Sequence, residues 1–320
     1  MRIYVLALNE VFDTGLTTLL DTFCTANDLV DSAGTPSTRF DVTVVGVRSR
    51  VHTSHGLLVP IRSATRLACP DVALVPALGA KMPETVRLAL ERRDVKDAQV
   101  LLRRWSGSGT LVGAACTGTF VLAGTSLLNG HSATTSWWLA PFFRERYPHV
   151  VLDDSRMLVS SSGFVTAGAA LAHLDLALWL VRRKSPALAA LTARYLVVEP
   201  RPSQAAFAIP DHLAHSDPLV ERFERWARRQ LADGFSLSEA ARAVVTSERT
   251  LARRLQSVLG KSPLAYVQDL RVERAVHLLR TSSASIDQIA TQVGYADGVT
   301  LRTLIRRKIG RGVRELRARN

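Results

Sequence analysis

The 320-residue sequence contains only three cysteines, Cys24, Cys69 and Cys116, which are too few for a disulfide framework. It also lacks an uninterrupted apolar run of about 20 residues, the length that a membrane-spanning helix needs. Its first ten residues become acidic too early for a secretory signal peptide, and they predict a buried strand instead. These absences favour a protein of the reducing cytoplasm with no membrane partner.

Metal ligands are equally scarce. His52 and His55 are three residues apart, but they fall in a predicted loop with no cysteine or carboxylate nearby in the sequence. We therefore expect no metal and no cofactor.

Positive charge is concentrated near the C-terminus. The whole chain carries a net charge of +13, and residues 219–320 alone contain 20 lysines and arginines against 10 acidic residues. A basic excess confined to one segment is typical of a protein that binds the phosphate backbone of nucleic acid. The length allows about two domains, so the basic segment predicts a separate DNA-binding domain.

A helix-turn-helix pattern begins at Ser236. Apolar residues recur at helical spacing over 237–244, a short break follows, and a second helix is predicted from Ser247 to Leu259, ended by Gly260. The polar face of this second helix suits the major groove. It supplies the first candidate DNA contacts, which are Ser247, Arg249, Thr250, Arg253 and Arg254.

The pattern then repeats after a long helix. Pro263 opens a helix to about Arg280, roughly 27 Å long at 1.5 Å per residue. A second pair of helices is predicted over 286–293 and 299–309, ended by Gly310. This rod could place two recognition helices in successive major grooves. The further candidate DNA contacts are Thr300, Arg302, Thr303, Arg306 and Arg307.

Residues 248–255, 260–266, 270–275 and 289–295 resemble, in order and spacing, the AraC/XylS family of bacterial transcription regulators. The second unit departs from the family pattern. Gly298 and Val299 replace its usual proline and serine, and Thr303 stands where an arginine is common. Because arginine is the strongest reader of guanine, we expect the first unit to read most of the sequence and the second mainly to grip phosphates.

Strand and helix patterns alternate in the first two-thirds of the chain, which predicts a parallel sheet with helices on both faces. We expect strands over 2–8, 41–47, 71–76 and 111–115, a hairpin-like excursion over 51–60, and helices over 14–32, 83–104 and 165–183. The strand ending at Ala115 runs directly into Cys116 and a helix, the geometry of a nucleophile elbow. The start of that helix is expected to lower the thiol pKa and to bind an anion.

Residues 116–123, 133–135 and 166–178 resemble the DJ-1/PfpI domain, a flavodoxin-like α/β fold related to class I glutamine amidotransferases. That domain is fused to an AraC-type unit in regulators of the GlxA family. The resemblance implies a sensor and dimerisation domain over 1–195, a proline-containing linker over 196–216, and an all-α DNA-binding domain with a double helix-turn-helix over 217–320.

Enzymes of this family pair the elbow cysteine with a histidine and an acidic group. Here the histidine position is Ser136, while His131 and His173 lie elsewhere in the sequence. We therefore expect no enzymatic activity. Cys116 is interpreted as the wall of a ligand pocket, with a buried structural thiol and a working nucleophile as alternatives. The candidate pocket lies at the carboxyl edge of the sheet and comprises Asp13, Leu78, Gly79, Cys116, Thr117, Ser136 and Trp137.

Trp137 or Trp138 with Asp13 could hold a cationic ligand. The alternative is that both tryptophans belong to the core or to a dimer interface.

Together the patterns predict a cytoplasmic, sequence-specific regulator of transcription. Its expected partners are double-stranded DNA, a second copy bound through the N-terminal domain, a small-molecule effector and RNA polymerase. Two alternatives stay open at this stage. One is a cysteine-dependent hydrolase or amidase carrying a DNA-binding tail, and the other is an architectural DNA-binding protein without sequence preference.

Overall fold

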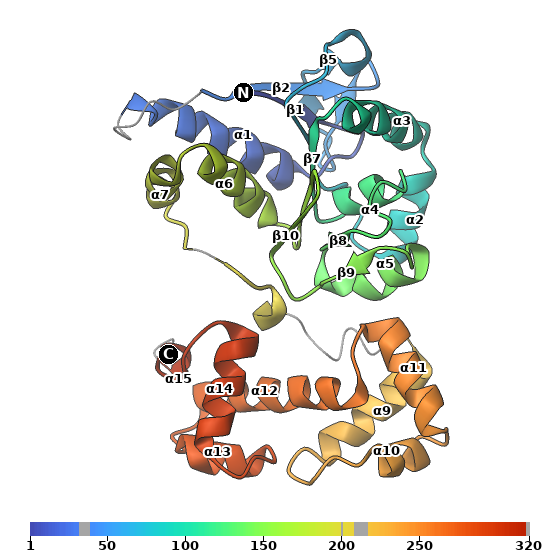
Figure 1. Cartoon of the computed structure of the whole chain (residues 1–320), viewed down its shortest axis with the longest axis vertical. Helices are drawn as coiled ribbons and strands as arrows, with labels where there is room; N and C mark the ends of the chain where they lie inside the picture. Colours follow the sequence, from blue (N-terminus) through green and yellow to red (C-terminus); the bar gives the residue numbers. More distant parts are fainter. Residues whose placement is uncertain (32–38, 200, 208–216, 318–320) are drawn as a thin grey trace. The chain divides into compact units, whose positions relative to one another are not determined.

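The computed structural model describes residues 1–31, 39–199, 201–207 and 217–317 (Figure 1). The chain divides into two compact units, Met1–Gln204 and Ala205–Asn320. Each unit has its own core, and each is described separately below.

A seven-stranded sheet forms the centre of the first unit, in the order β10-β11-β7-β6-β1-β2-β5. Every neighbouring pair is parallel except β10 and β11. Two short pairs, β3 with β4 and β8 with β9, lie outside this sheet. The strand bounds are β1 Arg2–Leu6, β2 Asp41–Gly46, β3 Val51–His52, β4 Leu58–Val59, β5 Arg62–Ser63, β6 Val72–Val75, β7 Leu111–Ala115, β8 Ser132–Ala133, β9 Val151–Leu152, β10 Leu158–Ser161 and β11 Phe164–Ala167.

Helices cover both faces of the sheet, as the alternating pattern predicted (Figure 1). One core lies beneath α2 (Pro83–Glu91), α3 (Arg93–Gly107), α4 (Gly118–Ala123) and α5 (Ala140–Arg146). The other lies beneath α1 (Asp13–Asp28), α6 (Ala172–Lys184) and α7 (Pro186–Tyr195). The predicted α/β class is therefore confirmed.

Two helix predictions were wrong. The apolar run 165–183 is not one helix, because its first residues belong to β11, which is paired with β7 and β10. The four residues of β11 are all buried, and a short apolar run gives no periodicity that separates a buried strand from a helix. The helix expected over 83–104 breaks at Arg92, which is extended (φ −63°, ψ 145°) and whose guanidinium pairs with Glu10 and Asp94.

The first unit continues beyond α7. The Gln204 side chain is fully buried, and its Nε2 donates to the Thr135 carbonyl at 2.8 Å and to Thr134 Oγ1 at 3.2 Å. The backbone of Met157 also donates to Pro202, and that of Gln204 to Ser155. Residues 196–204, the expected start of the linker, therefore pack on the first unit as far as they are described. Residues 208–216 of the expected linker lie outside the described residues.

The second unit consists of helices whose ends follow local capping signals. Ser236, Ser247, Ser285 and Asp297 each accept a hydrogen bond from a backbone N–H of the first turn that they cap. Gly260 and Gly310 end the two recognition helices in the left-handed conformation. The predicted double helix-turn-helix is confirmed. Its helices are α9 Pro218–Arg229, α10 Leu237–Ala243, α11 Glu248–Leu259, α12 Pro263–Thr281, α13 Ile286–Gln292, α14 Gly298–Ile309 and α15 Val313–Arg317.

None of the helices in the described ranges combines the length and the apolar character that a membrane crossing requires.

Candidate functional site

A strained turn places Cys116 between β7 and α4. Cys116 has a φ of +55°, a conformation that non-glycine residues rarely adopt. Two residues later, Gly118 lies so close to β6 that an added Cβ would be 2.3 Å from the carbonyl oxygen of Val75. Only glycine fits there. The elbow geometry expected from the sequence is therefore confirmed.

The Cys116 thiol is enclosed by hydroxyl groups. Its Sγ lies 2.8 Å from Ser136 Oγ. Thr135 Oγ1 donates to the Cys116 carbonyl at 2.7 Å, and Thr117 Oγ1 donates to the Leu78 carbonyl at 2.9 Å. Since Cys116, Thr117 and Ser136 are all buried, this part of the candidate pocket is a closed, hydrogen-bonded cluster.

Burial raises the pKa of the Cys116 thiol, and the hydrogen bonds from Ser136 and Thr117 offset only part of this rise. The expectation that the helix start lowers this pKa was wrong, because desolvation of the thiolate outweighs the contribution of a six-residue helix. The raised pKa disfavours the thiolate form, which is the nucleophilic form of a cysteine.

No histidine within the described residues hydrogen-bonds to Cys116. The His173 ring is fully used elsewhere: the Ala77 N–H donates to Nε2 at 3.0 Å, and Nδ1 donates to the Ala170 carbonyl at 2.6 Å. Burial lowers the pKa of His173 to about 4. His131 contacts Ser161 and the Phe164 ring. Among the described histidines, neither His131 nor His173 thus occupies the position of a base for Cys116.

Asp13 joins the same edge of the sheet through the loop that precedes α1. Phe12 N donates to the Ala77 carbonyl at 2.8 Å, and Gly79 N donates to the Glu10 carbonyl at 2.7 Å. Loops after β1, β6 and β7 thus meet at the carboxyl ends of adjacent strands, where the sequence placed its candidate pocket.

The Asp13 carboxylate has partners that sequence reasoning missed. Its Oδ2 accepts from Ser54 Oγ and pairs with His55 Nδ1, each at 2.7 Å. Burial alone would raise the pKa of Asp13, but hydrogen bonds that include those from Ser54 and His55 outweigh it and hold the pKa well below its usual range. The other carboxylate oxygen, Oδ1, is buried and has no hydrogen-bond partner among the described residues. No local pattern links Asp13 to His55, because 42 residues separate them.

The two tryptophans are half-buried beside this edge. Trp137 contacts Trp138 edge to face at 5.6 Å, and Trp138 Nε1 donates to the Lys81 carbonyl at 3.0 Å. A ligand role stays a prediction for all seven candidate residues, which are Asp13, Leu78, Gly79, Cys116, Thr117, Ser136 and Trp137.

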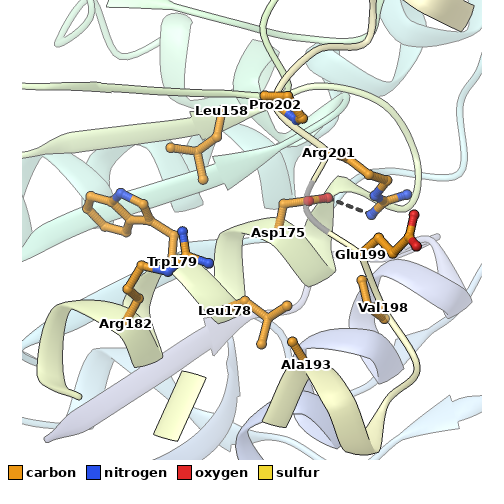
Figure 2. A pocket seen from close by; sticks show the side chains of 10 residues that line it. All are labelled: Leu158, Asp175, Leu178, Trp179, Arg182, Ala193, Val198, Glu199, Arg201 and Pro202. Atoms are coloured by element: carbon orange, nitrogen blue, oxygen red, sulfur yellow. Dashed lines mark hydrogen bonds and ion pairs between the residues drawn. The ribbon is translucent and has the colours of Figure 1, made fainter. Parts of the chain in front are cut away.

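A cavity of about 240 Å³ opens at a different place in the first unit (Figure 2). The Asp175–Arg201 ion pair, at 2.5 Å, lies in its wall and ties the segment after α7 to α6. Burial raises the pKa of Asp175, and Arg201 offsets part of this rise. None of the candidate pocket residues lines this cavity, whose walls come from β10, α6, α7 and the segment after α7. The lining residues are Leu158, Asp175, Leu178, Trp179, Arg182, Ala193, Val198, Glu199, Arg201 and Pro202.

In the second unit, α11 presents two arginines to solvent. Arg249 and Arg253 are exposed, and within the described residues no hydrogen bond or ion pair engages their side chains. Ser247 and Thr250 are instead hydrogen-bonded to each other in the helix cap. Two guanidinium groups on the outward face of a recognition helix have the chemistry needed to bind guanine or phosphate.

Arg254 differs from the other candidate DNA contacts. Its guanidinium pairs at 2.5 Å with Asp217, whose side chain is 3% exposed and caps α9. The partner lies 37 residues away, so sequence spacing gave no sign of the pair. Arg254 therefore has a structural partner already.

The outward face of α14 is less basic at its N-terminal end. Arg302, Arg306 and Arg307 are exposed, whereas Thr303 Oγ1 donates to the Val299 carbonyl at 3.0 Å. Thr300 belongs to the cap formed by Asp297.

Two residues of α12 connect the helix-turn-helix units. Asp269 accepts from Lys261 at 2.8 Å, and it also pairs with Lys308 of α14. Arg271 is buried, donates to the carbonyls of Leu231 and Asp233, and stacks over the Tyr295 ring at 5.3 Å. The central helix α12 thus holds the two helix-turn-helix motifs in a fixed relation.

Known families match both parts of the chain. The profile of the DJ-1/PfpI family matches residues 1–183, and that of a helix-turn-helix domain matches residues 240–319. The chain therefore belongs to the DJ-1/PfpI family and joins to that domain an AraC-type helix-turn-helix domain, as the sequence patterns predicted.

Curated relatives of the chain are named as transcriptional regulators. The HTH-type transcriptional regulator GbdR of Pseudomonas aeruginosa is 26% identical over 212 residues, which are 65% of this chain and 58% of that regulator. The chain thus spans under two-thirds of the length of that relative. The HTH-type transcriptional regulator GlxA of Rhizobium meliloti is 27% identical over 236 residues, 71% of each chain. Among solved structures, an AraC family transcriptional regulator from Pseudomonas putida has a TM-score of 0.51 at 21% identity, covers 61% of this chain and 98% of its own, and supports the fold alone.

Proposed function

We propose that the protein is a sequence-specific DNA-binding regulator of transcription that acts in the cytoplasm. The observation that carries the proposal is the pair of exposed, unengaged arginines on α11, Arg249 and Arg253, within a double helix-turn-helix. The similar regulators GbdR and GlxA support the same function.

In this proposal α11 and α14 enter successive major grooves. Arg253 reads a base, because a guanidinium can donate two hydrogen bonds to guanine. Arg306 and Arg307, on the later turns of α14, contact phosphates, which position the helix without specifying sequence.

The experiment selects binding sites from random duplexes at fixed salt and then measures variants on the selected site and on unrelated DNA. Arg253→Ala should weaken binding to the selected site by about 1–3 kcal/mol and relax preference at one position. Arg307→Ala should weaken both DNAs alike and reduce the salt slope by about one. Arg103→Ala, an exposed arginine of α3, serves as the matched control.

An equal loss on both DNAs for Arg253→Ala would contradict its assignment as a base reader. Tight binding with no enriched sequence would favour the architectural alternative.

We also propose that the first unit dimerises and binds a small effector at the carboxyl edge of its sheet, and that the bound regulator acts on RNA polymerase. Two observations support a cationic effector: Oδ1 of Asp13 is buried without a partner among the described residues, and Trp137 and Trp138 are half-buried. Asp13→Asn should abolish the thermal stabilisation that an effector gives. Sedimentation of the purified chain tests the dimer, and transcription from a promoter carrying the selected site tests the effect on polymerase.

The cysteine-hydrolase alternative is disfavoured by the buried thiol of Cys116, whose pKa is raised, and by Ser136 in the place of a base. Turnover of an ester or amide that Cys116→Ser abolishes would restore it.

A further inference from the structure

The two recognition helices occupy equivalent positions in an internal repeat of 50 residues. Ser247 and Asp297 cap them through the same bond, to the backbone N–H three residues later. Both helices end in a left-handed glycine, Gly260 and Gly310. The fixed offset makes Val299 the counterpart of Arg249, and Thr303 the counterpart of Arg253.

The side chains at these two positions differ in chemistry. On α14, the buried residues Leu301, Leu304 and Ile305 face the core, which directs Val299 and Thr303 to the opposite side of the helix. They lie one turn apart. Val299 is 67% exposed, and no other exposed large apolar side chain occurs among the described residues of either recognition helix.

The Thr303 side chain also presents its apolar part. Its hydroxyl donates to the Val299 carbonyl at 3.0 Å and is thereby occupied within the helix. With its proton used in that bond, the hydroxyl can only accept from a partner, and the methyl group is the apolar part of Thr303 that stays exposed. The first turns of α14 therefore offer adjacent methyl groups where α11 offers two guanidinium groups.

In the major groove, the feature that matches an exposed methyl surface is the C5-methyl group of thymine. We propose that Val299 and Thr303 allow the second helix-turn-helix motif to recognise thymine methyl groups. This inference rests on the proposed DNA-binding function and makes it more specific. The second helix-turn-helix motif then contacts bases as well as phosphates. Arg302 and Arg306 are exposed on the same helix, and in this proposal they supply the phosphate contacts that hold the apolar pair in the groove.

The test uses the full chain and the site selected by the wild-type protein. Each thymine of that site is replaced singly by uracil, which removes only the methyl group, and affinity is measured by fluorescence anisotropy at fixed salt. We expect one or two thymines to respond, about one duplex turn from the base affected by Arg253→Ala. At each of them, removal of the methyl group should lower the affinity of the protein for the duplex roughly fourfold.

The same uracil substitutions are then measured with Val299→Ala. Alanine is a better helix former, so the variant should fold, and the loss at those thymines should shrink to less than about twofold. Val245→Ala is the matched control, because Val245 is a 90% exposed valine outside both recognition helices. With this control variant, replacing the responsive thymines by uracil should lower the affinity as much as it does with the wild-type chain.

The failures are distinguishable. A selected site with no thymine that responds to uracil, or an undiminished response in Val299→Ala, overturns this inference while the regulator function stands. A pool with no enriched sequence overturns both.

Discussion

The buried imidazole of His173 should make the stability of the first unit depend on pH. Its Nε2 accepts from Ala77 N and its Nδ1 donates to Ala170 O, so only the neutral ring satisfies both bonds. Burial lowers its pKa from 6.5 to about 4. As the pH falls below about 6.5, the unfolded chain takes up a proton that the folded chain excludes.

The sign follows from this difference. The stability that neutral His173 provides is complete above about pH 6.5 and is lost progressively as the pH falls towards 4. At about 1.36 kcal/mol for each unit of pKa difference, the loss amounts to about 2 kcal/mol at pH 5 and about 3 kcal/mol at pH 4.

The assay is urea unfolding at pH 7.5 and pH 5, compared between the wild-type chain and His173→Gln. Glutamine can still accept from Ala77 N but does not titrate. Between the two pH values the wild-type chain should lose about 2 kcal/mol more than the variant. Tryptophan fluorescence reports mainly on the first unit, which contains four of the five tryptophans: Trp105, Trp137, Trp138 and Trp179.

His149→Gln, which replaces an exposed histidine of the same unit, should behave like the wild-type chain. Equal pH dependence in the wild-type chain and His173→Gln would refute the reasoning. The comparison uses the change with pH, so a constant effect of the substitution cancels.

Three further predictions test local geometry. Val245 is 90% exposed at a φ of +57°, so Val245→Gly should stabilise the second unit by about 0.5–1 kcal/mol in urea unfolding, whereas Val299→Gly in α14 should destabilise it by a similar amount; a loss in both would contradict the strain. Arg254→Ala should lower stability by about 1–3 kcal/mol, because it strands the buried Asp217 carboxylate, and an unchanged melting curve with weaker DNA binding would assign Arg254 to DNA instead. Gly118→Ala should prevent folding or cost more than about 3 kcal/mol, and wild-type stability would argue against the tight elbow.

The second unit could be predicted almost residue by residue, because its helix ends depend on local chemistry. Ser247, Gly260, Ser285 and Gly310 determine helix ends through bonds or backbone conformations within a few residues. The wrong prediction at 165–183 arose because tertiary contacts, and not the local sequence, determine whether these residues form a strand or a helix. Phe164–Ala167 is a strand because β7 and β10 lie on either side of it.

The candidate site divides in the same way. The elbow at Cys116 was visible in a run of neighbouring residues. The partners of Asp13 and Arg254 were not, because His55 and Asp217 are distant in the chain. The pKa of Cys116 was predicted in the wrong direction, since sequence does not reveal how completely a thiol is buried.

The unlike outward faces of α11 and α14 give the DNA-binding unit a polarity. Two helices with the same outward face would read the same base sequence twice. Under the proposed readout, Arg249 and Arg253 at one end and Val299 and Thr303 at the other require two different base sequences in a fixed order. A single DNA site therefore has a direction, and exchanging its two base sequences would place the wrong bases opposite both helices. In that proposal, the order of the two base sequences along the duplex sets which side of the bound protein faces a neighbouring promoter.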